Sequence, residues 1–383
     1  MALHFSRETF AARIARTCAA MREARLDALL MFRQESMYWL TGYDTFGYVF
    51  FQCLVLTADG RMVLLTRSPD LRQAQLTSII DDIRIWRDDA EADPAVDLRE
   101  IMAELDLDGG RIGIELEAYG LTGRSLRRTE RALEGFCALV DASLLVSRLR
   151  LVKDAAELDC VRRAARLADD AWTAGIAEIR PGAFEGDILA AMQGAVFRGG
   201  GDYSGNEFII GSGPNALLCR YFSGRRHLDA EDQITLEFAG VWRRYHAALM
   251  KTVPVGRVTA RQREMHGVAV DALLACEHRL RPGSTMADVF EAHADTFDRA
   301  GLSAHRLNAC GYCLGTTFAP NWMDWPMFHA GNGVELAPGM VFFLHMILMD
   351  SDSGTAMTLG RTSIVTDGGP ELLSSMPLDL VSA

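Results

Sequence analysis

The chain has 383 residues, a formal net charge of -12 and 49% hydrophobic side chains. A length beyond the size at which one hydrophobic core stops growing predicts two domains. The acidic balance, with no run of Lys or Arg that concentrates positive charge, excludes a nucleic-acid partner and an anionic membrane surface. The N-terminal segment interrupts each apolar run with Arg or Glu, which argues against a signal peptide or a membrane span and predicts a cytoplasmic location.

Eight cysteines are spread over the chain. Without a secretory signal, this spacing favours reduced thiols over disulfides. Cys310 and Cys313 form a C-x-x-C motif, but it has no second cysteine pair and no His-x-x-His nearby. A zinc or redox site is therefore the weaker interpretation, and two packed thiols are the alternative.

The first part of the chain alternates helical and strand patterns, as expected of a small α/β domain. An amphipathic helix is predicted over 7–25 and another over 120–136. The segment FFQCLVLTADGRMVLLT predicts a hairpin through its Asp-Gly turn, and LDALLMF and RIGIELE predict further strands. We place this domain at residues 1–150.

The second domain, predicted at residues 151–383, begins with a long helix that Asp154 is placed to cap. It then contains an internal echo: RPGAFEGDI at Arg180 and RPGSTMADV at Arg281 share the spacing R-P-G-x-x-x-x-D-[IV]. Each segment leads into a helix that ends at a glycine, and strands follow. The sequence therefore predicts a duplicated supersecondary unit.

Duplication makes the strand ITLEFAG, with Glu237, equivalent to GMVFFLHMIL, with His345. A glutamate is almost never fully buried without a partner or a task, so the two polar residues predict a shared cleft. Strand alternation allows His246 to reach the same site. The alternatives are a structural carboxylate paired with Arg243 or Arg244, and hydrogen-bonded core histidines.

Several segments resemble the creatinase and prolidase family, whose members have the pita-bread fold. They include LVKDAAELDCVRRAARLADDA, the two RPG turns, LEFAGVWRRYH, GYCLGTTFAPNWMD, LAPGMVFFLHMIL and LGRTSIVTDGGPELLS. The resemblance implies a small α/β N-terminal domain followed by a pita-bread catalytic domain with an internal pseudo-twofold repeat. It also implies a homodimer, in which an exposed N-terminal loop carrying Tyr43, Asp44, Phe46 and Tyr48 closes the partner's site.

Metallopeptidases of this family hold two metal ions with two aspartates, a histidine and two glutamates. At the matching positions this chain has Glu237, Ala248, Tyr312, His345, and Gly360 or Arg361. Two possible ligands supply neither a dinuclear site nor the three protein ligands usual for one catalytic zinc. We therefore expect no metal and no cofactor.

Creatinase itself works without a metal, but its catalytic residues are not matched here, because its positions hold Arg220, Met250 and His345. Within the family, the segments LEFAGVWRRYH, WLTGYD and GYCLGTTFAPNWMD resemble the ectoine hydrolases. That resemblance implies a glutamate nucleophile at Glu237. The chain differs from the ectoine hydrolases at Asn321, Asp324 and His345. These differences predict a substrate related to ectoine and not ectoine itself.

The resulting hypothesis is hydrolysis of a non-peptide C–N bond in a small cyclic or zwitterionic metabolite. Glu237 acts as nucleophile or as general base, and His246 and His345 are candidates to move the proton. Arg220 could bind a substrate carboxylate, with a surface salt bridge as the alternative. The further substrate-binding candidates are Tyr312, Trp322, Asp324, Tyr43 and Asp44. Two other functions stay open: a metal-dependent Xaa-Pro dipeptidase and a non-catalytic binding protein.

Overall fold

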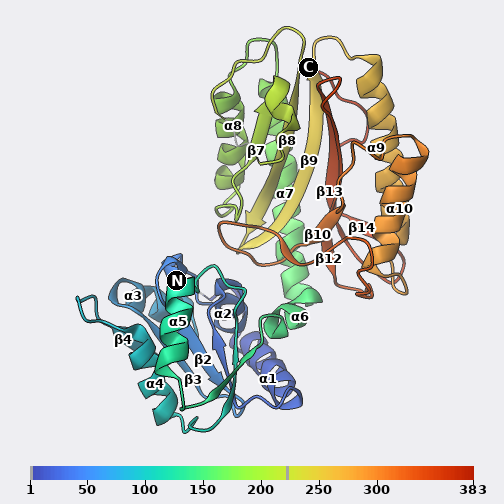
Figure 1. Ribbon diagram of the computed structural model, residues 1–383. Coiled ribbons are helices and arrows are strands. Elements are labelled where there is room, and N and C mark those ends of the chain that lie inside the picture. The colour runs from blue at the N-terminus through green and yellow to red at the C-terminus, as the bar shows by residue number, and fades with distance from the viewer. Residues whose placement is uncertain (1–2, 221–223) are drawn as a thin grey trace. The chain divides into compact units, whose positions relative to one another are not determined.

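The computed structural model describes residues 3–220 and 224–383. Figure 1 shows two compact units, Met1–Arg150 and Leu151–Ala383, each built around its own sheet. The fold is the mixed α/β architecture expected from the sequence.

The N-terminal unit has a mixed sheet with strand order β4-β3-β2-β1-β5-β6. Its strands are β1 Ala28–Met31, β2 Cys53–Thr57, β3 Met62–Arg67, β4 Asp82–Trp86, β5 Arg111–Ile114 and β6 Ala138–Asp141. Its helices are α1 Arg7–Glu23, α2 Gln34–Thr41, α3 Leu71–Thr77, α4 Pro94–Glu104, α5 Gly123–Ala132 and α6 Leu145–Leu151. Successive residues of β1 enter two separate cores, with Leu30 on the side of α4 and Leu29 on the side of α1. The sheet is therefore the middle of three layers.

Helix α5 concentrates positive charge, although the sequence has no run of Lys or Arg there. Its four arginines recur at helical spacing and line one shallow hollow of about 430 Å³, namely Arg124, Arg127, Arg128 and Arg131. The stripe is not visible as a run in the sequence, because a helix brings together on one face residues that are three or four positions apart. The expectation that nucleic acid is not a partner stays a prediction.

The C-terminal unit has a sheet in the order β11-β10-β12-β13-β9-β8-β7, with β14 paired to β13. The strands are β7 Ile209–Ser212, β8 Asp232–Trp242, β9 Tyr245–Val255, β10 Gly311–Cys313, β11 Asp324–Met327, β12 Val341–Asp350, β13 Thr355–Ile364 and β14 Glu371–Leu372. The helices are α7 Ala155–Glu178, α8 Glu185–Arg198, α9 Ala260–Arg279 and α10 Met286–Arg299. Asp154 caps α7 with a capping box to Glu157, as the sequence predicts.

The strand order confirms the internal repeat. Toward the centre of the sheet, β7, β8 and β9 of one half correspond to β10, β12 and β13 of the other, with β11 as an additional edge strand. The halves meet where β9 pairs with β13. Each half contributes a helix pair, α7 with α8 and α9 with α10. Glu237 on β8 and His345 on β12 therefore occupy equivalent strands of the two halves.

The long helices pack against one face of this sheet, α7 on β8 and β9 and α9 on β12 and β13 (Figure 1). Gly240 makes the contact with α7 possible, because a β-carbon there would lie 2.0 Å from the carbonyl oxygen of Ala164. On the α9 side, Arg361 forms a bidentate ion pair with Glu277, with N–O distances of 2.7 and 2.8 Å. Strand alternation then directs Glu237 and Gly360 to the opposite face.

None of the helices within 3–220 and 224–383 combines the length and the apolar character needed to span a bilayer.

Candidate active site

The candidate site lies along one row of residues that crosses the sheet. Glu237 pairs with Met250, Met250 with Gly360, and Gly360 with His345. Directly paired residues place their side chains on the same face, so Glu237 and His345 project from the face that the helices leave uncovered. The polar pair expected from the duplicated sequence therefore shares one face and one row.

A hydrogen-bonded chain of three side chains converges on Glu237. The indole Nε1–H of Trp322 donates to the hydroxyl oxygen of Tyr312 over 2.7 Å, and this hydroxyl donates to Oε1 of Glu237 over 3.3 Å. Indole nitrogen is only a donor, so it occupies an acceptor position of the hydroxyl and leaves the hydroxyl proton for the carboxylate. Trp322 is fully buried and reaches Glu237 only through Tyr312.

The electrostatic environment of Glu237 brings its titration close to neutral pH. Burial raises the pKa of its carboxyl group to about 7, while the charge of Arg220 and the hydrogen bond from Tyr312 act in the opposite direction. Near neutral pH both protonation states are then populated, which suits a group that must accept a proton or attack as an anion.

His345 faces the same site with unused hydrogen-bonding capacity. Its ring centroid is 5.6 Å from that of Tyr312, and its Nδ1 has no hydrogen-bond partner among the described residues. Burial lowers the pKa of His345 to about 4, a backbone hydrogen bond opposes this, and the charge of Arg220 adds to it. The imidazole is therefore neutral at ordinary pH.

His293 is a neighbour that sequence reasoning missed. It is fully buried on α10, its ring is 4.8 Å from that of Phe297, and neither ring nitrogen has a partner within the described residues. Burial, followed by the charge of His345, lowers its pKa to about 3. Its sequence context, a histidine among helical phenylalanines, does not distinguish it from an ordinary core residue.

His246 shares the face of Glu237 but lies away from it, because it pairs with Val241, four positions along β8 and about 13 Å distant. Its Nε2 accepts from the backbone N–H of Gly205 over 2.9 Å, which leaves Nδ1 to donate to Thr317 over 3.0 Å. With both nitrogens engaged, the geometry matches the alternative of a hydrogen-bonded core histidine.

Arg220 is exposed, yet its charge acts on both Glu237 and His345. It is therefore near enough to meet an anionic group of a bound molecule, although residues 221–223 beside it lie outside the described chain. Arg243 and Arg244 instead form the two-residue turn between β8 and β9, with φ of 50° and 67°. Arg243 is six positions along the chain from Glu237, about 20 Å at the rise of a strand, so the expected alternative of pairing with Glu237 is wrong.

The last candidate of the C-terminal unit, Asp324, lies on β11, the strand that pairs with β10. Asp324 accepts from the backbone N–H of Trp325 over 2.9 Å, and its Oδ2 would lie 3.2 Å from a β-carbon at Gly315. The ammonium of Lys153 would lie 3.6 Å from the same β-carbon, and it donates to the sulfur of Cys313 over 3.1 Å.

The C-x-x-C cysteines make different contacts, since the thiol of Cys310 is hydrogen-bonded to the thiol of Cys276, whereas the sulfur of Cys313 accepts from Lys153. This geometry favours the packed-thiol alternative over a zinc or redox site.

In the N-terminal unit the expectation of an exposed loop is wrong for its tyrosines. Tyr43 is fully buried, with its hydroxyl 3.3 Å from Gln52 and 3.4 Å from Thr66, and Tyr48 is 7% exposed. Asp44 is half-buried, and its backbone carbonyl accepts from Gln73 over 2.7 Å. The exposed apolar side chains of this loop are those of Phe46, Val49 and Phe50. Aromatic spacing alone could not distinguish the inward from the outward positions.

The residues of the site do not fit a pair of metal ions. Glu237 is the single carboxylate of its row, and Gly360 and Ala248 contribute no donor atom. Arg361, the other candidate for the last ligand position, points to Glu277 on the helix side. In the described residues, no group of three or more His, Cys, Asp or Glu side chains is arranged to hold a metal ion.

Comparison with known proteins identifies the family. Residues 159–367 match the model of metallopeptidase family M24, and residues 13–152 match the creatinase/prolidase N-terminal domain. The first match covers more than half of the chain, so the protein belongs to metallopeptidase family M24 and to the class of hydrolases. The expected fold, with a creatinase-like domain followed by a pita-bread domain, is confirmed.

Named relatives carry more than one activity. The chain is 25% identical to the ectoine hydrolase of Halomonas elongata over 99% of this chain and 98% of that protein. It is 20% identical to the Xaa-Pro dipeptidase of Pyrococcus furiosus over 62% of this chain and 67% of that one. Among solved structures, a prolidase from Thermococcus sibiricus superposes with a TM-score of 0.87 at 18% identity, covering 98% of this chain and 99% of that one. The similarity to the T. sibiricus prolidase structure, at 18% identity, shows the fold alone.

Proposed function

We propose that the protein hydrolyses a non-peptide C–N bond in a small, cyclic or zwitterionic metabolite without a metal ion. The observation that carries the proposal is the single buried carboxylate, Glu237, whose pKa of about 7 lies in the working range and whose row offers no second acid. The ectoine hydrolase of H. elongata, similar over almost its entire length, supports this substrate class.

Glu237 starts the reaction in one of two ways. As a nucleophile, its carboxylate oxygen attacks the carbon of the C–N bond, and water later cleaves the resulting ester or anhydride. As a general base, it takes a proton from water, whose oxygen forms the new C–O bond. In both cases the C–N bond breaks and the departing nitrogen gains a proton.

The surrounding side chains then have distinct tasks. Tyr312 donates to Glu237 and keeps the carboxylate oriented. His345, a neutral imidazole with Nδ1 available, can relay the proton to the departing nitrogen. Arg220 supplies a charge complementary to a carboxylate of the substrate, through its planar guanidinium group.

We propose further that the enzyme is a cytoplasmic homodimer. All eight cysteines are free thiols, as expected in a reducing compartment. Phe46, Val49 and Phe50 expose 77%, 59% and 46% of their surface, which favours burial of this loop against a second copy. The closing of the partner's active site by this loop belongs to the same proposal.

A metal-dependent Xaa-Pro dipeptidase is the second candidate, because dipeptidases are among the relatives. Turnover of ectoine, hydroxyectoine, creatine, cyclic amidines and Xaa-Pro dipeptides, followed by mass spectrometry, distinguishes the candidates. We expect a ring-opened product from an ectoine-like compound and no turnover by Glu237→Gln. Hydrolysis of the dipeptides alone would favour the second candidate. Binding without turnover of any compound would favour a non-catalytic protein.

A further inference from the structure

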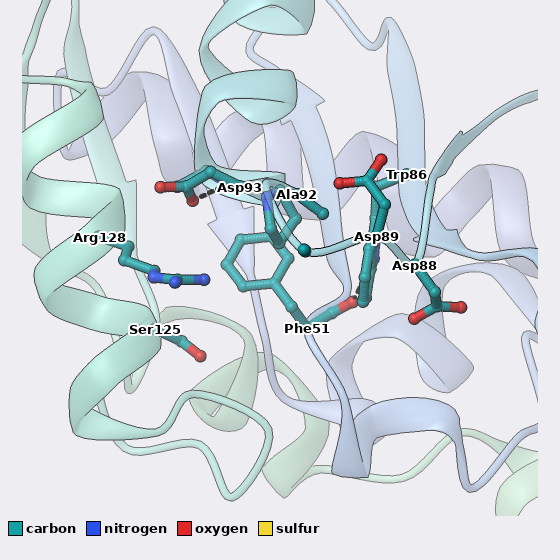
Figure 2. A pocket seen from close by; sticks show the side chains of 11 residues that line it. Phe51, Trp86, Asp88, Asp89, Ala92, Asp93, Ser125 and Arg128 are labelled. Carbon is teal, nitrogen blue, oxygen red and sulfur yellow. Dashed lines mark hydrogen bonds between the residues drawn. The ribbon is translucent and has the colours of Figure 1, made fainter.

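A second pocket, of about 480 Å³, lies within the N-terminal unit. Figure 2 shows Phe51 and Trp86 at its base, Asp88 and Asp89 on one side, and Ser125 and Arg128 of α5 on the other, with the loop continuing to Asp93 on the side of Arg128. A pocket of this size, with aromatic walls and a few polar groups, suits a small ligand. No residue of the Glu237 site lines it.

The apolar base of the pocket is rigid. Phe51 is 8% exposed and belongs to the core beneath the sheet, and Trp86 packs against the same core. The indole Nε1–H donates to the carbonyl oxygen of Phe51 over 2.9 Å, which joins the end of β4 to the segment before β2. The two rings are therefore fixed before any ligand enters.

Opposite charges are held apart around this base. Arg128 reaches from α5 toward the ring of Phe51, while Asp88 and Asp89 lie beyond it (Figure 2). Arg128 forms no ion pair or hydrogen bond within the described residues. Asp88 is engaged by Arg67 at 3.0 and 3.1 Å, whereas one oxygen of Asp89 accepts from the backbone of Glu91. Arg128 and Asp89 thus remain to meet a ligand.

Further carboxylates lie near the Asp89 side of the pocket. The pKa of Asp97 is raised by burial first and then by the charges of Glu100, Asp93 and Asp89. A cationic group placed among these carboxylates relieves their repulsion, and aromatic faces add to its attraction. A purely anionic ligand is disfavoured there, but an anionic end is accommodated by Arg128.

We propose that this pocket binds a small zwitterion of the amino-acid type. Its anionic end contacts Arg128, and its cationic end lies between Asp89 and the rings of Phe51 and Trp86. Neither end alone uses both charged walls, so the pocket prefers a molecule that carries both charges. This site is separate from the proposed hydrolytic reaction and does not depend on it.

Calorimetric titration of the full-length protein with three probes of equal chain length tests the proposal. The probes are δ-aminovalerate, which is zwitterionic, pentylamine, which is cationic, and valerate, which is anionic. We expect δ-aminovalerate to bind about fivefold or more tightly than either of the others. The parent and Glu237→Gln should give the same result, because the hydrolytic site is not involved.

Variants of the two walls provide the decisive comparison. Arg128→Gln should weaken the binding of δ-aminovalerate and valerate but not that of pentylamine. Asp89→Asn should weaken the binding of δ-aminovalerate and pentylamine but not that of valerate. Arg124→Gln, on the same helix but outside this pocket, is the matched control and should change nothing. Equal affinity for all three probes, no saturable binding, loss of binding in Glu237→Gln, or equal effects of Arg128→Gln and Arg124→Gln would each overturn the proposal.

Discussion

Tyr312 donates its hydroxyl proton to Oε1 of Glu237 over 3.3 Å, although their strands, β10 and β8, are separated in the sheet by β12, β13 and β9. A flat sheet would keep the two backbones about 19 Å apart, so the sheet must curve to bring them together. The two halves of the duplicated unit thus meet at one carboxylate. This contact explains why a lone acid is tolerated in an apolar strand, since it has a donor and a nearby cation.

Replacement of Tyr312 by phenylalanine should move the pH dependence of catalysis. The hydrogen bond from Tyr312 lowers the pKa of Glu237 against the larger effect of burial. Its removal raises that pKa further, and since the ionised form reacts, the rising limb of kcat/KM against pH moves to higher pH. A pH–rate profile of Tyr312→Phe checks this, and an unchanged profile would contradict it.

Trp322→Phe should shift the same limb in the same direction by a smaller amount. The indole N–H fixes the orientation of the Tyr312 hydroxyl but does not contact Glu237. A purely structural role would lower kcat at all pH values without displacing the limb. Comparison of the two pH profiles therefore separates positioning from packing.

Glu237→Gln should stabilise the protein at neutral and higher pH. The folded state raises the pKa of Glu237 from 4.5 to about 7, so it binds this proton more tightly than the unfolded state does. The contribution to stability is present below pH 4.5 and is lost as the pH rises through about 7. Glutamine does not ionise, so the variant does not lose this part of the free energy of unfolding, which is on the order of 3 kcal/mol.

Urea unfolding of parent and variant at about pH 4.5 and about pH 8 measures the difference. Asp170→Asn, at an exposed position of α7, is the control and should show no such pH-dependent gain. An equal stability difference between Glu237→Gln and the parent at both pH values would contradict the raised pKa.

The two candidate histidines should behave differently on substitution. His345→Gln should lower kcat about a hundredfold with little effect on stability, because the residue shares the face of Glu237 and its Nδ1 has no partner among the described residues that the substitution would leave unsatisfied. His246→Gln should lower the free energy of unfolding by about 2 kcal/mol, because it leaves buried partners unsatisfied, and should leave the pH profile unchanged. Kinetics and chemical denaturation of both variants test this assignment, and the reverse pattern would refute it.

Arg361 should contribute to stability and not to catalysis. Arg361→Met leaves the buried carboxylate of Glu277 without its cation, which costs about 3–5 kcal/mol. The double variant with Glu277→Met should recover much of this loss, because no charge is then left uncompensated. Denaturation curves measure both, and a large fall in kcat for the folded double variant would instead place Arg361 in the site.

The sequence predicted the repeat, the capped helix α7 and the equivalence of Glu237 and His345, because these follow from local spacing and strand alternation. It could not predict that the indole of Trp322 donates to Tyr312 or that the backbone of Gly205 donates to His246, since Trp322 and Gly205 lie in loops whose path no local pattern predicts. The inward position of Tyr43 was missed for a similar reason. Its hydroxyl partners, Gln52 and Thr66, belong to later parts of the chain.

The most direct test of metal-independent catalysis by Glu237 is the turnover of protein stripped of metal by exhaustive dialysis against a chelator. Once a substrate is identified, the rate is compared before stripping, after stripping, and after addition of Mn²⁺, Zn²⁺ or Co²⁺. We predict the same rate in every case. Loss of turnover on stripping, with recovery in proportion to the metal bound, would contradict it.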